Sequence, residues 1–448
     1  ARKFYEAAVD LWPEDEASRP QLFFRYAQAV HLIEPLNSVA VLTEARDVLL
    51  SVGDSGTAAE TEILIGETFW LQGEQDALLA RVRAAEALVA DAPSSYSKAY
   101  VVANVSRFAV LAGENDDATR LGRQALAMAE EFGIDELRSH ALNNMGIARV
   151  QKGDVGGVED LEKSIAIAVA ANSPESVRGY GNLASILMDL GELERAYAMN
   201  AEGLRLGERF GLADWLLWLR SERIWKLYFE GAWDDALSQL DELIAEFIEN
   251  QFWMETPCRW LRGRIRLARG DGRGAQEDAE RALERAEVAK DPQVLWPALG
   301  FGARAFVATD SARGEGFASR LLSDWQEHGL GISGSDSEWM VDLSVVLVAL
   351  GKQAALVELM SRATAATPWR KAAALYVSGH FGKAADVYAE IGALPEEAYA
   401  RLREAERLVS DGRRGEGDRE LQRSLAFWRS VGATAYVLEG EQLLAEAG

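Results

Sequence analysis

The 448-residue sequence contains a single cysteine, Cys258, and only ten prolines. One cysteine cannot form an internal disulfide, and it cannot build a cysteine-rich zinc site or a CxxC redox motif. A reducing, cytoplasmic environment fits this composition. The sequence also lacks a run of about twenty uninterrupted apolar residues, so it predicts no membrane span. Its N-terminus lacks the basic and then apolar pattern of a secretory signal.

Basic residues are scarce relative to acidic ones. The 47 Lys and Arg residues face 71 Asp and Glu residues, which gives a formal net charge of −24. This charge repels a phosphate backbone, and binding nucleic acid would require a segregated basic face strong enough to overcome it. We therefore expect no nucleic-acid partner.

Motifs that carry catalysis or bind metals are missing from the sequence. There is no G-x-S-x-G elbow, no HExxH and no phosphate-loop motif. No histidine has a second His or a Cys at metal-ligand spacing; the four are His31, His140, His328 and His380. The sequence therefore predicts a protein that is not an enzyme and that has neither a metal site nor a cofactor.

The sequence does have a helix-forming composition and an internal repeat. Ala, Leu, Glu and Arg are plentiful, which favours helices. Glycines recur at steps of 40, 40, 38, 40 and 39 residues, at Gly73, Gly113, Gly153, Gly191, Gly231 and Gly270. An amphipathic segment of roughly fifteen residues lies on each side, and glycine allows the left-handed conformation that ends a helix. This period predicts an array of helical hairpins.

Small side chains follow the turn glycines at helical spacing, as at Ala275, Ala279 and Ala282, and would let two helices approach closely. We therefore predict an all-α protein, an α-α superhelix of about ten helical hairpins. Residues 1–329 form its regular part, with a period near forty, and residues 330–448 form less regular helical repeats and a terminal helix. The glycine- and serine-rich stretch 327–338 is predicted to be a loop or hinge.

Two stretches resemble the tetratricopeptide repeat (TPR). "YGNLASILMDLGELERAYAMNAEGL", residues 180–204, and "LNNMGIARVQKGD", residues 142–154, carry its small residues and its turn glycine. Asn200 departs from the pattern, which has an aromatic residue there, and the period exceeds the usual length of about 34 residues. Longer helices are implied, similar to those in the repeat regions of bacterial signal-transduction ATPases, including maltose-activator-like regulators.

Both ends of the chain look like the C-terminal region of adenylate/guanylate cyclases that carry an ATPase module. They are "FYEAAVDLWPEDEASRPQLFFRYAQAV" and "LAFWRSVGATAYVLEGEQLLAEAG". The first of these begins in the middle of a predicted helix. We therefore expect the chain to be the C-terminal regulatory part of a larger ATPase- or cyclase-type signalling protein.

The resemblance also implies a binding face. The first helix of each TPR hairpin lines the concave inner surface, where a protein, peptide or effector binds. Its inward positions correspond here to Tyr100, Arg107, His140, Asn143, Arg178, Trp218, Trp225, Tyr228, Trp260 and Arg264. Aromatic residues and Arg are enriched at protein interfaces. The implied partner is a protein or peptide, including the upstream ATPase or cyclase domains of the same protein.

Six of the thirteen tryptophans lie between residues 215 and 260, and the sequence leaves their role open. They could line a recognition groove, or they could fill wide gaps between long helices. In the second case the chain could be a passive scaffold or oligomerisation arm without a ligand.

A stripe of arginines lies in "CRWLRGRIRLARGD", residues 258–271. Four of them share an arc of about 80° on a helix; they are Arg259, Arg262, Arg266 and Arg269. The next predicted helix carries glutamates at the same spacing, namely Glu277, Glu280, Glu284 and Glu287. The pattern predicts a ladder of ion pairs within one hairpin, and a carboxylate or phosphate partner is the alternative.

Overall fold

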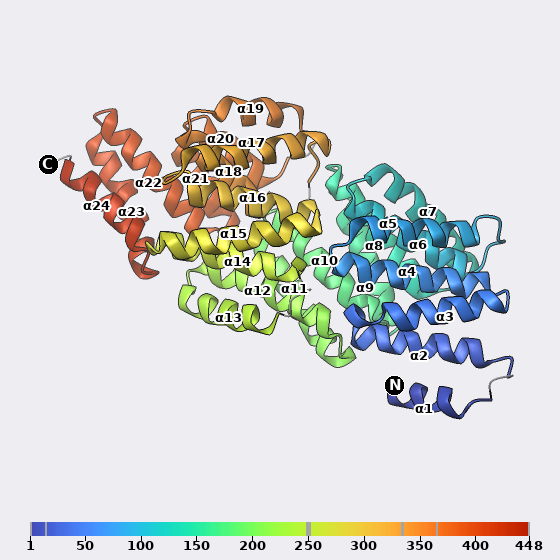
Figure 1. The fold of residues 1–448 in the computed structure, drawn as a ribbon. Helices are drawn as coiled ribbons and strands as arrows, with labels where there is room; N and C mark the ends of the chain where they lie inside the picture. The colour runs from blue at the N-terminus through green and yellow to red at the C-terminus, as the bar shows by residue number, and fades with distance from the viewer. Residues whose placement is uncertain (1, 14–15, 248–251, 333–335, 364–365, 447–448) are drawn as a thin grey trace.

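The computed structural model describes residues 2–13, 16–247, 252–332, 336–363 and 366–446 (Figure 1). Within these ranges it contains 24 α-helices, one short 3-10 helix and no β-strand. The predicted all-α fold is therefore confirmed.

Most of the helices are between 13 and 18 residues long. In chain order they are α1 (Arg2–Leu11), α2 (Arg19–Ile33), the 3-10 helix η1 (Pro35–Asn37), α3 (Val39–Ser51), α4 (Ser55–Leu71), α5 (Gln75–Val89), α6 (Tyr96–Leu111), α7 (Asn115–Phe132), α8 (Asp135–Gln151), α9 (Gly157–Ala170), α10 (Glu175–Asp189), α11 (Leu193–Phe210), α12 (Ala213–Glu230), α13 (Trp233–Glu246), α14 (Phe252–Ala268), α15 (Gly272–Ala289), α16 (Pro292–Phe306), α17 (Ser311–Glu327), α18 (Asp336–Ala349), α19 (Gln353–Arg362), α20 (Pro368–Val377), α21 (Phe381–Ile391), α22 (Leu394–Ser410), α23 (Arg414–Ser430) and α24 (Thr434–Glu446).

Consecutive helices pack as hairpins, and each hairpin packs on the next one along the chain. The six glycines that the sequence places at turns all have positive φ angles, between 74° and 91°. Glycine adopts this left-handed conformation without the steric cost that a Cβ atom imposes. The predicted period therefore corresponds to the spacing of real hairpin turns.

Small residues bring the two helices of a hairpin together. The clearest case is the contact between α8 and α9, where a Cβ atom at Gly146 would lie 2.7 Å from the carbonyl oxygen of Gly157. In α15, the predicted stripe of Ala275, Ala279 and Ala282 is completely buried. Both observations agree with the close packing that the sequence predicts.

The array also winds back on itself. Three helices of the C-terminal part lie against helices of the middle part, because α18 contacts α10, α22 contacts α12 and α24 contacts α14. The indole N–H of Trp369 donates to the carbonyl oxygen of Met188 over 2.8 Å. At the other end, the turn between α4 and α5 touches the end of α15, since a Cβ atom at Gly73 would lie 3.1 Å from the Cα of Ala289.

The predicted division of the chain at residue 329 concerns the regularity of its repeats, and it remains a prediction. Helix α17 ends at Glu327 and α18 begins at Asp336, inside the predicted loop, of which residues 333–335 lie outside the described part of the chain. A single buried hydrophobic cluster extends from Val150 to Ala433 and crosses this point. The two segments therefore share one core.

None of the helices in the described ranges combines the length and the apolar character needed to cross a membrane.

Candidate functional site

The inner surface of the N-terminal half contains an open groove with a volume of about 440 Å³. Its walls come almost entirely from the even-numbered helices α2, α4, α6, α8, α10 and α12, which are the first helices of their hairpins. Gln293, at the start of α16, adds a wall where the array winds back. The groove therefore lies on the concave face that the repeat pattern predicts.

The first charged cluster in the groove joins α2, α4 and α6. Arg107 donates from Nη1 to Oε1 of Glu67 over 2.7 Å, and Nε2 of His31 lies 3.4 Å from the other carboxylate oxygen. Burial alone would raise the pKa of Glu67, but the charges of Arg107 and His31 outweigh it and lower this pKa. The guanidinium of Arg107 also lies 5.4 Å from the ring centre of Trp70. These contacts hold a fixed cation on the groove wall.

The second charged cluster repeats this arrangement on α8 and α10. Arg178 donates from Nη1 to Oε2 of Glu175 over 3.1 Å, and Nδ1 of His140 lies 3.3 Å from the same oxygen. Arg178 also donates to the side-chain oxygen of Asn144. Burial raises the pKa of Glu175, but the nearby His140 and Arg178 outweigh it and lower this pKa to about 2. Glu175 is therefore ionised at neutral pH.

Aromatic side chains close the α12 end of the groove. Trp215 and Trp218 both line it, and their rings meet edge to face with centroids 5.1 Å apart. Trp218 is half-buried and packs on α10, where a Cβ atom at Gly181 would lie 2.5 Å from its ring. The groove thus combines apolar surface with two oriented guanidinium groups.

Three of the ten residues predicted for the binding face line this groove, and three others lie on the groove helices α6 and α8. Arg107, Arg178 and Trp218 line it directly. Tyr100 is half-buried on α6, and His140 contacts Glu175 as described above. Asn143 is only 1% exposed, and neither atom of its amide has a hydrogen-bond partner among the described residues.

The other four predicted residues do not line the groove. Trp225 and Trp260 are each 1% exposed, and Tyr228 and Arg264 are each 5% exposed. These side chains do point to the inner face of α12 and α14, but the helices that wind back cover that face. The prediction that they line an open groove is therefore wrong. For Trp225 and Trp260, the alternative of core filling is correct.

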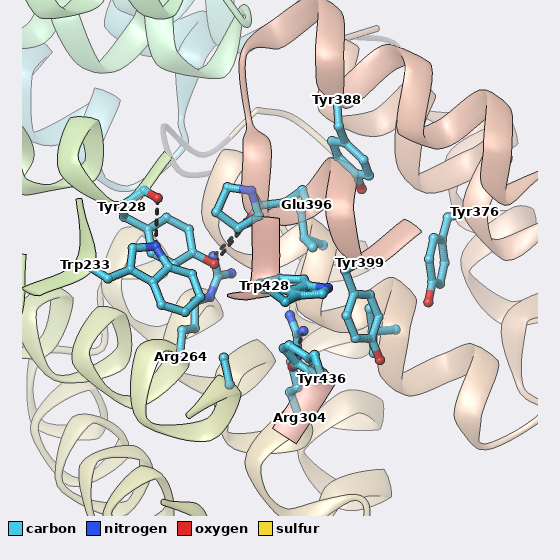
Figure 2. A pocket seen from close by; sticks show the side chains of 14 residues that line it. Tyr228, Trp233, Arg264, Arg304, Tyr376, Tyr388, Glu396, Tyr399, Trp428 and Tyr436 are labelled. Carbon is cyan, nitrogen blue, oxygen red and sulfur yellow. Dashed lines mark hydrogen bonds and ion pairs between the residues drawn. The ribbon is translucent and has the colours of Figure 1, made fainter. Parts of the chain in front are cut away.

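The covered inner face encloses a second cluster of polar side chains (Figure 2). Arg264 donates from Nε to Asp342 of α18 over 3.0 Å, and Arg304 of α16 donates to the other oxygen of Asp342 over 2.7 Å. Tyr228 donates its hydroxyl proton to Oε1 of Glu396 in α22 over 3.2 Å. Burial raises the pKa of Glu396 to about 7, against the opposing charges of Arg264 and Arg304. These contacts tie the middle helices to the C-terminal ones.

The arginine stripe also has different partners from those predicted. Arg259, Arg262 and Arg266 all pair with one carboxylate, that of Asp278, over 3.3, 2.6 and 2.9 Å. Asp278 is 1% exposed, because it lies on the face of α15 that packs against α14. The predicted glutamates lie on other faces of α15 and pair elsewhere, as Glu277–Arg273, Glu280–Arg313, Glu284–Arg281 and Glu287–Arg320. The ladder prediction is therefore wrong in its partners.

The sequence analysis missed the acidic members of both groove clusters, Glu67 and Glu175. A usable signal was present, because Glu67 and Arg107 are separated by one repeat period of 40 residues and occupy equivalent positions in successive first helices. Within the described ranges, no group of three or more His, Cys, Asp and Glu side chains could hold a metal ion.

Comparisons with known proteins bear on the fold. No protein-family model and no curated protein matches the sequence. Among solved structures, a Rap protein complexed with Competence and Sporulation Factor superposes with a TM-score of 0.56 at 14% identity, over 73% of this chain and 92% of that one.

Two other solved structures give lower scores. One is the Signal Transduction ATPase with Numerous Domains protein with a tetratricopeptide repeat sensor from Pyrococcus horikoshii, with a TM-score of 0.44 at 14% identity over 76% of this chain and 55% of that one. The other is the apo form of the quorum sensor NprR from B. thuringiensis, with a TM-score of 0.43 at 11% identity over 85% and 99%. Together with the hairpin geometry, the likeness to the Rap protein establishes that this chain is a TPR-like repeat protein.

Proposed function

We propose that the chain is a non-catalytic interaction module that binds a peptide or an extended protein segment in the groove of its N-terminal half. The observation that carries this proposal is the groove itself, which remains hollow on the inner face of six successive first helices. Its volume lies in the range of ligand sites in proteins.

The chemistry of the groove supports an extended ligand of mixed character. Trp70, Trp215 and Trp218 offer apolar surface, while Arg107 and Arg178 offer guanidinium groups held in place by Glu67 and Glu175. Aromatic and Arg side chains dominate the binding energy of protein interfaces. Because these groups are already held by their neighbours, a ligand would lose little binding energy to ordering them.

The Rap protein that shares this fold was solved in complex with Competence and Sporulation Factor. A binding role for a concave helical array is therefore in keeping with that neighbour. We further propose that the chain is the C-terminal regulatory part of a larger ATPase- or cyclase-type signalling protein. This linkage rests on the resemblance of the two chain ends, and a phosphate-loop motif encoded upstream of Ala1 would support it, whereas its absence would contradict it.

A passive scaffold is the competing function. The burial of Trp225 and Trp260 favours it, because these side chains have a packing role that needs no ligand. A scaffold has no need of a hollow lined by half-buried aromatic and charged side chains, however. The groove favours the binding module.

The proposal can be tested by selecting peptides from a random display library on the immobilised 448-residue protein. Selected peptides are then titrated by calorimetry against the wild type and against the variants Trp218→Ala and Arg107→Ala. We expect each variant to weaken binding at least about tenfold, which is the loss typical of central interface residues. Arg205→Ala is the matched control, because Arg205 is exposed on α11, away from the groove, and pairs with Glu202.

Equal affinity for wild type and both groove variants would contradict the proposal. A selection that enriches no peptide above background would do so as well.

A further inference from the structure

The covered inner face of the C-terminal half contains a small cavity that the proposed function does not use. Its volume is about 20 Å³, which exceeds the ~10–15 Å³ that a single water needs. Side chains of helices α12, α13, α14, α16, α18, α20, α21, α22, α23 and α24 line it (Figure 2). The cavity therefore has room for one small occupant.

Two buried N–H donors that line the cavity have no acceptor. Arg264 uses Nε for Asp342 and Nη2 for the carbonyl oxygen of Glu338, but its Nη1 has no hydrogen-bond partner among the described residues and lies 3.8 Å from Oε1 of Glu396. The indole N–H of Trp428 is also buried without a partner within the described part of the chain. A buried donor without an acceptor is costly, so such groups are normally satisfied by a ligand or a water.

The charges around the cavity depend on one carboxyl group. Arg264 and Arg304 share Asp342, which is completely buried, so one positive charge is left over. Glu396 lines the cavity itself, and its Oε2 has no partner among the described residues. Burial raises its pKa to about 7. Below that pH Glu396 is neutral, and its proton is available as a third donor.

We propose that this cavity binds a single small inorganic anion of halide size, taken up together with a proton on Glu396. The anion accepts hydrogen bonds from Nη1 of Arg264, from the indole N–H of Trp428 and from the protonated Oε2 of Glu396. Tyr228, which donates to Oε1, leaves Oε2 as the oxygen that carries the proton. The anion also balances the excess charge of the two guanidinium groups.

Two helices that border the cavity, α13 and α23, present Trp233 and Trp428, and the other helices around Glu396 present a charged or titratable group to it or to the same cavity. These groups are Tyr197 of α11, Tyr228 of α12, Arg264 of α14, Arg304 of α16, Asp342 of α18, Tyr376 of α20, Tyr388 of α21, Tyr399 of α22 and Tyr436 of α24. Burial raises the pKa of Tyr228, Tyr376, Tyr388 and Tyr399, so these side chains are neutral at physiological pH. Glu396 is therefore the group whose protonation decides whether the cavity carries a net positive charge.

The test compares thermal unfolding of the full chain in about 0.3 M sodium chloride or sodium bromide with unfolding in sodium gluconate at the same ionic strength, since a ligand that binds the native state raises the melting temperature. At pH 6 we expect halide to raise the melting temperature by about 1–2 °C. At pH 8 the rise should shrink, because Glu396 must then take up a proton for the anion to bind.

Two tryptophan variants locate the effect. Trp428→Phe removes the indole N–H from the cavity and should abolish the halide effect. Trp339→Phe should keep it, because Trp339 is equally buried and its N–H also lacks a partner among the described residues, but it does not line the cavity. Crystals of the wild type grown in sodium bromide provide a readout that needs no variant, and an anomalous peak between Arg264 and Trp428 is expected.

Equal melting temperatures in halide and gluconate would overturn the proposal and leave a water as the occupant. The absence of the bromide peak, or loss of the halide effect in Trp339→Phe, would also overturn it.

Discussion

The two halves of this molecule present the same face of the same kind of helix, yet one half is open and the other is filled. In the N-terminal half, the inner faces of α2 to α12 surround a groove of about 440 Å³. In the C-terminal half, the inner faces of α12 to α24 meet around a cavity of about 20 Å³. The repeat therefore does not decide whether a concave surface is free. The tightness of the winding decides it, because α18, α22 and α24 return onto α10, α12 and α14.

The charges of the two halves differ accordingly. In the open half, Glu67 and Glu175 each face an arginine and a histidine, and the pKa of Glu175 falls to about 2 despite burial. In the closed half, burial dominates and the pKa of Glu396 rises to about 7. Burial, together with the charges of Glu222 and Asp189, also raises the pKa of Glu338. Ion pairs that border the groove thus hold Glu67 and Glu175 ionised in the open half, whereas burial favours the neutral form of Glu396 and Glu338 in the closed half.

The largest effect is expected when one arginine is removed from each half. Arg264→Ala takes a partner from Asp342, which is 0% exposed, and should lower the free energy of unfolding by about 3–5 kcal/mol. Arg178→Ala should cost less, because its partner Glu175 borders the groove and water can reach it. Urea denaturation of both variants measures the difference. Equal losses would show that the two halves are not distinguished by water access.

The next test uses pH. An acid whose pKa is raised by folding binds its proton more tightly in the native state, so stability falls as pH rises from its ordinary value near 4.5 to about 7. Glu396→Gln should remove this loss, which we expect to be on the order of 1–3 kcal/mol. Denaturation series at pH 5 and pH 8 check it, with Glu390→Gln on the exposed face of α21 as the control. Identical pH profiles for wild type and Glu396→Gln would contradict the prediction.

The third test asks whether close helix packing matters in the open half. Gly146→Ala places a methyl group against the backbone of α9 and should cost about 1–3 kcal/mol. Gly316→Ala on α17 meets no atom within 4 Å and should stabilise by about 0.5–1 kcal/mol. Thermal unfolding distinguishes the expected loss of stability in Gly146→Ala from the expected gain in Gly316→Ala. A neutral Gly146→Ala would mean that α8 and α9 can move apart.

The smallest expected effect concerns the outer surface, where the two halves should behave alike. Glu287→Gln breaks the exposed pair with Arg320 and should change stability by no more than about 1 kcal/mol. Arg195→Gln does the same at the pair with Glu162 in the other half. A much larger loss of stability in either variant, measured by urea denaturation, would show that the outer ion pairs also differ between the two halves.

The hairpins could be predicted from the sequence because their causes are local. A turn glycine such as Gly153 and a small contact residue such as Gly146 act within one or two neighbouring helices, and their positions alone indicated the repeat. The inward direction of Arg107, Arg178 and Trp218 followed from the resemblance to the tetratricopeptide repeat.

The closing of the C-terminal half could not be predicted, because it depends on contacts across a full superhelical turn. A Cβ atom at Gly231 would lie 3.1 Å from the ring of Phe427, almost two hundred residues along the chain. Small rotations from each hairpin to the next add up to bring these two segments into contact, and no local sequence pattern predicts them. The partners of Arg262 were missed for a related reason, since the side of α15 that faces α14 is set by packing and Asp278 lies on that side.

The contact of the turn at Gly73 with the end of α15 limits how the molecule can deform. Successive coils of the spiral already touch there, so the array cannot shorten along its axis without a collision of backbones. It can only lengthen, and lengthening would widen the gap between those two segments. A mechanical pull on the two ends should therefore separate this contact before any hairpin comes apart.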